Sequence, residues 1–381
     1  MKMGRGPGTP GSPSMSTASP RRRGATAQAL LFWILAIALF ALPFLKKPAT
    51  AGWDDGQDPR SEANWQDPDE PFNEDDFPFG EDLAYWDAEL SADLGESLSE
   101  FVRSNSEAYF GVTSNALRDA GVIEVSRLAA GRKTYEAECA GCHGIEGDGS
   151  VAGDGAGPAA RFMNPRPRNF RKGKFKFTST ASGERPMRKD LYRVISNGIA
   201  GASKPHFKLL TDERRMDIVE YVRYISVRGE FEQMLLGLTV EDEELPDPQE
   251  IAELVNSWWD ERNLSSVFPA TPETENDEAS IERGRVLYMD ASRGNCVSCH
   301  GETGIGDGPS ATAFKDEWGY AIRPRDFTGG VYRSGGENAQ LWTMIATGIG
   351  GTPMAAFAGS MTSDEIWDVV HFVKSLERKE N

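Results

Sequence analysis

The chain has 381 residues, which is room for two or three domains. Its formal net charge is −18 at pH 7, which argues against a nucleic-acid partner because such partners are bound by basic surfaces. Acidic residues are concentrated in residues 52–130 and 230–280, whereas residues 131–229 carry an excess of basic side chains. Two alternatives stay open for the acidic segments: they are solvated linkers, or they fold back onto the basic segment or steer a cationic partner.

The first residues, 1–24, are rich in Gly, Pro and Ser, which predicts a disordered N-terminus. Residues 25–51 carry an uncharged apolar run behind a cluster of arginines, which predicts a membrane anchor or signal peptide with the rest of the chain exported. The run is too long for the hydrophobic region of a typical signal peptide and slightly short for a full span. A small-x-small site ending at Ala51 permits cleavage, but two lysines before it disfavour cleavage. We therefore expect an uncleaved anchor, with an exported soluble protein as the alternative.

The acidic segments 52–125 and 230–279 also carry apolar residues at helical spacing. We expect short helices there that pack on or between the neighbouring domains. The tryptophans Trp86, Trp258 and Trp259 are expected to be packing anchors and not electron relays.

All four cysteines lie in two pentapeptides, CAGCH and CVSCH. C-x-x-C-H is the attachment signature of c-type haem, in which the thiols bond to the porphyrin vinyl groups and the histidine binds the iron. A structural zinc site needs four ligands, and a redox dithiol does not need the histidine. The sequence therefore predicts two covalently attached haem c groups, held by Cys139, Cys142 and His143 and by Cys296, Cys299 and His300.

The chain repeats itself over residues 126–229 and 280–381. RPRNF matches RPRDF, and LYRVISNGIAG matches LWTMIATGIGG, in the same order after the cysteine motifs. The copies end in TDERRMDIVEYVRYI and TSDEIWDVVHFVKSL, each with an N-cap-like start and apolar residues at helical spacing. Each copy is thus expected to run helix, haem motif, Gly/Pro-rich loops, short helix, loop and terminal helix.

This order resembles the class I cytochrome c family in both copies. The resemblance implies an all-α fold of two tandem class I cytochrome c domains, in each of which the first and last helices cross. It implies that glycine and tyrosine of the first helix pack on an aromatic ring of the last. These residues are Gly131, Tyr135 and Tyr221 in the first copy, and Gly284, Tyr288 and Phe372 in the second.

The resemblance also implies a loop methionine as sixth iron ligand, and Met354 stands at that place in the second copy. The first copy has Lys204 there and His206 two residues later. A lysine must lose its proton to bind iron, which is costly near neutral pH. Neutral imidazole is a good iron ligand. We therefore predict His206 as the ligand, with Lys204 or an open site as alternatives.

The paired RPR strings predict an anion site, because guanidinium groups bind carboxylates bidentately and haem carries two propionates. The alternative is ordinary surface charge beside a proline-stiffened turn. The candidates are Arg166, Arg168, Arg323 and Arg325.

Together these features predict a dihaem c-type cytochrome that transfers electrons on the periplasmic side of the cytoplasmic membrane. Its partner would be a respiratory complex, a terminal oxidase or a soluble redox protein. A six-coordinate His/Met haem has a raised potential and no open coordination site, which suits electron transfer. The alternatives are a dihaem cytochrome c peroxidase that uses the first haem, and a permanent cytochrome c subunit of a terminal oxidase.

Overall fold

The computed structural model describes most of the chain after the N-terminal region, namely residues 96–110, 120–147, 157, 159–163, 165–241, 246–315 and 322–378. The predicted anchor and Trp86 lie outside the described residues. The described part is helical and has no strand, apart from an isolated bridge between Thr180 and Ser266. Two hydrophobic cores, one for each copy of the repeat, confirm the predicted all-α fold. None of the described helices has the length and apolar character needed to cross a membrane.

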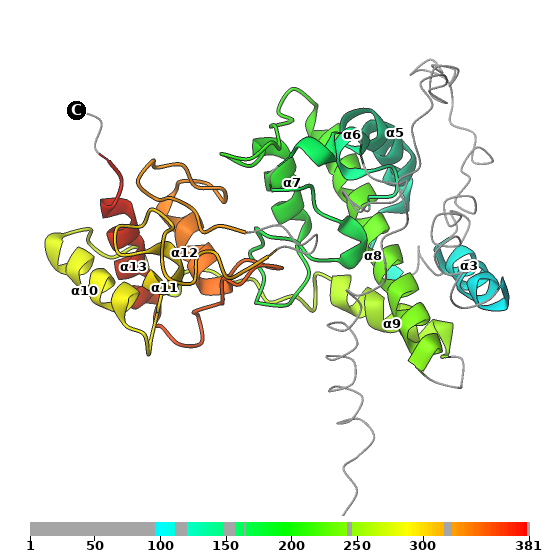
Figure 1. Ribbon diagram of the computed structural model, residues 1–381. Helices are drawn as coiled ribbons and strands as arrows, with labels where there is room; N and C mark the ends of the chain where they lie inside the picture. The colour runs from blue at the N-terminus through cyan, green and yellow to red at the C-terminus, as the bar shows by residue number, and fades with distance from the viewer. Residues whose placement is uncertain are drawn as a thin grey trace, which may run out of the picture. The chain divides into compact units, whose positions relative to one another are not determined.

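The first domain is built on a crossing between its first and last helices (Figure 1). Gly131 lies at this crossing, where a Cβ atom would come 2.3 Å from the carbonyl oxygen of Asp217. One turn later the ring of Tyr135 packs 5.2 Å from that of Tyr221. The helices are α5 (Leu128–Glu138), α6 (Ala140–His143), α7 (Arg188–Asn197) and α8 (Asp212–Glu241), with short 3₁₀ turns η3 (Val125–Arg127), η4 (Ala160–Phe162) and η5 (Phe170–Lys172).

The second domain repeats this crossing with equivalent residues. A Cβ atom at Gly284 would come 1.9 Å from the carbonyl oxygen of Asp368, and the rings of Tyr288 and Phe372 lie 5.0 Å apart. Its helices are α10 (Glu278–Met289), α11 (Val297–His300), α12 (Asn338–Thr347) and α13 (Ser363–Ser375). In Figure 1 the yellow helix α10 lies beside the red helix α13, as the contacts between them require. The predicted helix crossing is therefore present in both copies.

The terminal helices begin where the sequence predicts. Thr362 caps α13 by accepting a hydrogen bond from the backbone N–H of Glu365, whose carboxylate accepts one from the N–H of Thr362. In the first domain, the hydroxyl of Thr211 accepts a bond from the N–H of Arg214. Helix α8 is longer than expected, because it continues past residue 229, the predicted end of the first domain.

Two helices from the acidic segments pack against α8, namely α3 (Glu96–Phe110) and α9 (Pro248–Trp259). Trp259 of α9 is fully buried, and its indole N–H donates a 2.6 Å hydrogen bond to Glu230 of α8. The hydroxyl of Tyr224 donates to the carbonyl of Phe110, the last residue of α3. Helices α3 and α9, which both come from the acidic segments, thus lie against the last helix of the first domain.

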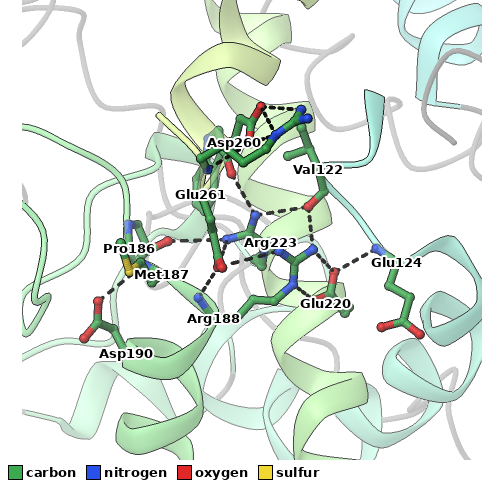
Figure 2. A network of polar contacts seen from close by, with 12 residues as sticks. Val122, Glu124, Pro186, Met187, Arg188, Asp190, Glu220, Arg223, Asp260 and Glu261 are labelled. Atoms are coloured by element: carbon green, nitrogen blue, oxygen red, sulfur yellow. Dashed lines mark hydrogen bonds and ion pairs between the residues drawn. The ribbon is translucent and has the colours of Figure 1, made fainter. Parts of the chain in front are cut away.

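A buried polar network holds the end of α9 to the first domain (Figure 2). Arg223 of α8 is fully buried and donates to the carbonyl oxygens of Val122 (3.0 Å) and Trp259 (2.9 Å). Glu261 lies 3.5 Å from Arg223 and accepts a 2.6 Å bond from the backbone N–H of Arg188. Basic residues of the domain therefore meet acidic residues that follow α9, which favours the folding-back alternative for this part of the acidic segment.

Candidate haem sites

The first cysteine motif opens into an apolar cleft. The cleft holds about 1160 Å³ of space, including its open mouth. Side chains from the cysteine motif, the loop around η5, α7 and the loop after α7 line it. The lining includes Cys139, Cys142, His143, Arg166, Arg168, Phe170, Lys176 and Lys204, together with Arg333 of the second domain.

The histidine of the motif is held by a ring and a carbonyl group. His143 ends the short helix α6, and its ring stacks on that of Phe170 with centroids 4.3 Å apart. Its Nδ1 lies 3.1 Å from the carbonyl oxygen of Arg168. A carbonyl only accepts hydrogen bonds, so Nδ1 carries the proton and Nε2 is left with the lone pair that binds a metal.

The second motif repeats this arrangement. The ring of His300 stacks on that of Phe327 at 4.4 Å, and its Nδ1 lies 3.4 Å from the carbonyl oxygen of Arg325. In both domains the tyrosine of the first helix donates a 2.8 Å hydrogen bond to the glycine after the histidine, Tyr135 to Gly144 and Tyr288 to Gly301. The helix crossing therefore fixes the position of each histidine.

Burial sets the protonation of both motifs. It lowers the pKa of His143 to about 3 and that of His300 to about 4, so both imidazoles are neutral at pH 7. It raises the pKa of Cys139 to about 11 and that of Cys296 to about 12. A neutral imidazole beside two cysteines in an apolar environment is the donor set that a covalently attached haem requires.

The loops that follow α7 and α12 have the same backbone structure in the two domains. We call residues 198–207 and 348–357 the sixth-ligand loops. Ile199 donates a 3.1 Å hydrogen bond to the carbonyl of Lys204, and Ile349 donates one of the same length to Met354. Gly198 and Gly348 open the loops at φ 67° and 71°, a left-handed conformation that favours glycine.

Lys204 and Met354 therefore occupy equivalent positions. Met354 packs against the second core, and Lys204 lines the first cleft. Burial lowers the pKa of the Lys204 amine, although the nearby thiols of Cys139 and Cys142 act in the opposite direction. His206 is exposed and does not line the cleft. The loop therefore brings Lys204, and not His206, to the cleft.

The predicted propionate-binding arginines divide into two groups. Arg166 and Arg168 are half-buried and line the first cleft. In the second domain, Arg325 is half-buried and donates to the carbonyl of Val331, whereas Arg323 is exposed. An anion-binding role is therefore better supported for the first pair than for Arg323.

Arg333 is a cleft residue that the sequence analysis missed. It lines the first cleft, and its Nε atom is buried with no hydrogen-bond partner among the described residues. A guanidinium donor that is free to form a further hydrogen bond at the cleft could bind a haem propionate. The repeat contains a signal for this residue. Arg333 stands at the same distance after its RPR string as Lys176 does in the first copy, and each follows an aromatic residue. Lys176 also lines the cleft.

The two domains touch through equivalent residues within the compact unit Pro68–Asn381. The Arg168 side chain donates to the carbonyl of Gly350, 3.5 Å away, in the sixth-ligand loop of the second domain. Conversely, the Arg325 guanidinium lies 3.0 Å from the position of a Cβ atom at Gly201, in the loop of the first domain. The second arginine of each RPR string thus meets the sixth-ligand loop of the other domain.

Comparisons with known proteins agree with this geometry. The cytochrome c family model matches residues 128–226 and 281–377. Among solved structures, the chain is similar to one from the reducing HAO-like protein complex Kustc0457/Kustc0458 of Kuenenia stuttgartiensis. The two are 32% identical with a TM-score of 0.52, over 65% of this chain and 96% of that chain. No curated protein matches the sequence.

Proposed function

The chain belongs to the cytochrome c family, and we propose that it is an exported dihaem electron carrier that works as the electron-transfer subunit or partner of a redox enzyme. Two cytochrome c domains, each with a C-x-x-C-H motif, imply covalently bound haem and haem-based electron transfer. The reciprocal contact between the RPR arginines and the sixth-ligand loops carries the proposal of a shared electron path, because it brings corresponding parts of the two sites together.

The haem supplies one-electron iron chemistry when it is bound. The chain supplies its attachment, orientation and surroundings. His143 and His300 are held by a stacked ring and a carbonyl group, so both imidazoles are presented in one tautomer and one orientation. The walls of the cleft are mainly apolar, which would limit the contact of a bound haem with water.

Export is proposed from the sequence. The apolar run within residues 25–51 follows a basic segment, as in anchors that leave the rest of the chain outside. Covalent haem attachment of this type takes place outside the cytoplasm. We infer that the haem domains lie on the periplasmic side and that residues 25–51 hold them at the membrane.

The partner is inferred from the solved relative. That chain is part of an HAO-like protein complex, and the similarity covers 96% of it. We infer that this chain likewise works inside a complex with a redox enzyme, which favours a permanent subunit over a freely diffusing carrier. A peroxidase is less well supported, because peroxide needs an open coordination site and Lys204 lines the cleft at the place of the sixth ligand.

The experiment uses the full-length chain with both haems attached. A reductive titration followed by absorbance should take up one electron per haem, and the reduced protein should transfer both electrons to an external acceptor. With hydrogen peroxide and a reduced donor, turnover should stay at background. Saturable peroxide turnover would contradict the carrier proposal and support the peroxidase.

A further inference from the structure

The structural equivalence of Lys204 and Met354 has a chemical consequence. Both carbonyl groups accept a 3.1 Å hydrogen bond from the isoleucine five residues earlier. Each loop then closes with a second 3.1 Å bond, from Phe207 to the carbonyl of Ile195 and from Phe357 to Ile345. The backbone therefore presents the side chain of Lys204 as it presents that of Met354.

The same hydrogen bonds keep His206 away from the cleft. The bonded residues Lys204 and Phe207 lie on either side of His206, and the residue between Lys204 and His206 is Pro205, whose ring fixes its own φ. His206 would reach the place of Lys204 only if the loop shifted by two residues. Such a shift breaks both loop hydrogen bonds and moves Phe207, which packs against the first core.

The side chain of Lys204 already lies inside the site. It lines the cleft together with His143 and the two cysteines, and its ammonium nitrogen lies 5.6 Å from the ring of Phe207. A lysine amine is a nitrogen donor once it has given its proton to water. We propose that the Lys204 amine is the sixth ligand of the first haem iron. This proposal rests on the covalent haem of the proposed function.

The two haem irons would then have different ligands. The first would have two nitrogen ligands, and the second the imidazole of His300 with the thioether of Met354. Thioether ligation raises the haem potential, so the first haem would have the lower potential of the two. Electrons that enter at the first haem would then move to the second, and the reverse transfer would be disfavoured.

Spectroscopy of the full chain with both haems tests the ligand. Electron paramagnetic resonance and near-infrared magnetic circular dichroism of the ferric protein distinguish amine, imidazole and thioether ligation. The wild type should show two low-spin haems, one histidine–methionine and one histidine–amine. Lys204→Ala should convert one haem to high spin, whereas His206→Ala should leave both low-spin. Lys208→Ala, which removes an exposed lysine of the same segment, is the matched control and should change nothing.

Lys204→Met is the decisive second variant, because it gives the first loop the residue of the second. It should double the histidine–methionine signal, abolish the histidine–amine signal and raise the potential of the first haem. Each variant must keep two haems per chain in the alkaline pyridine assay. Lys204→Met also covers the case in which Lys204→Ala loses its haem.

Two outcomes overturn the proposal. A low-spin first haem in Lys204→Ala that becomes high-spin in His206→Ala would make His206 the ligand. Binding of carbon monoxide by the untreated ferrous wild type with no histidine–amine signal would mean an open site. Because these measurements involve no redox partner, their failure leaves the carrier proposal standing. Peroxide turnover would contradict the carrier proposal without changing the ligand signals.

Discussion

Glu220 and His371 occupy the same position on the last helix of their domains, and each is fully buried. Glu220 accepts a 2.9 Å hydrogen bond from the backbone N–H of Glu124, in the segment before the first helix. His371 lies 3.3 Å from the carboxylate of Glu273, also in the segment before the first helix, and 2.7 Å from the hydroxyl of Ser280. The two domains therefore use different side chains at one position to hold the segment before the first helix against the last helix.

Glu220→Gln should destabilise the first domain. The substitution removes the charge that faces Arg188, which pairs with both oxygens of Glu220. Arg188 is partly exposed, so the expected loss is about 1.5–3 kcal/mol, the range for hydrogen bonds to charged groups. Denaturant unfolding of the protein measures it. Glu213→Gln, at an exposed position of α8, is the control and should stay within about 0.5 kcal/mol. A loss no larger than the control's would contradict the proposed role of this network.

The helix crossing should not tolerate a methyl group. At Gly131 a Cβ atom would come 2.3 Å from the carbonyl oxygen of Asp217 and 2.9 Å from Cβ of Tyr221, so the helices must move apart. Gly131→Ala should therefore destabilise by about 1–3 kcal/mol, as overpacking does. Gly237→Ala is the control, because nothing lies within 4 Å of its Cβ position in α8, and it should stabilise by about 1 kcal/mol. Thermal unfolding with opposite signs for the two variants would confirm the close contact.

The helix crossing was predictable because the residues that form it follow a pattern that can be recognised in the sequence. The order of glycine, aromatic residue and cysteine motif in each repeat indicates which residues meet, and the structure places Tyr135 and Tyr221 together. The folding-back of α9 was less predictable. Its helix follows from apolar spacing, but its docking depends on Trp259 meeting Glu230, a pair that no local pattern indicates.

In the first sixth-ligand loop, the sequence was a poor guide to side-chain placement for a different reason. The chemistry of free side chains favours an imidazole over an ammonium group, so the sequence led to His206. The backbone hydrogen bonds of Lys204 and Phe207 decide which side chain lies in the cleft. These bonds become evident only when the two loops are compared in three dimensions. Arg333 was missed for a related reason, since it belongs to the second copy and lines the cleft of the first.

Met354→Ala should remove the thioether ligand from the second haem. The weak sulfur-to-iron band in the far red should disappear from the oxidised protein, and the potential of that haem should fall. Met344→Leu is the control, because Met344 is a buried core residue of α12 and its replacement conserves volume. The control should keep the band. An unchanged spectrum in Met354→Ala would rule out Met354 as the ligand.

Acid should weaken the first domain through Glu232. Its carboxylate is buried, and it accepts hydrogen bonds from Ser106 (2.6 Å), Arg171 (2.5 Å) and Arg228 (2.7 Å). Burial alone would raise the pKa of Glu232, but the charges of Arg228 and Arg171 outweigh it and hold the pKa below its ordinary value. The folded state therefore favours the charged form, and this contribution to stability is fully present above the ordinary glutamate pKa of about 4.3.

The contribution should be lost as the pH falls through the lowered pKa of the folded state. At pH 7, Glu232→Gln should cost about 3–5 kcal/mol, because it removes a buried charge that pairs with two buried arginines. The difference in unfolding free energy between wild type and variant should shrink as the pH falls below about 4.3. Glu107→Gln, at an exposed position of α3, is the control and should differ from wild type by no more than about 0.5 kcal/mol at every pH. A wild-type advantage over Glu232→Gln that stays constant from neutral pH into the acid range would show that the Glu232 charge does not stabilise the fold.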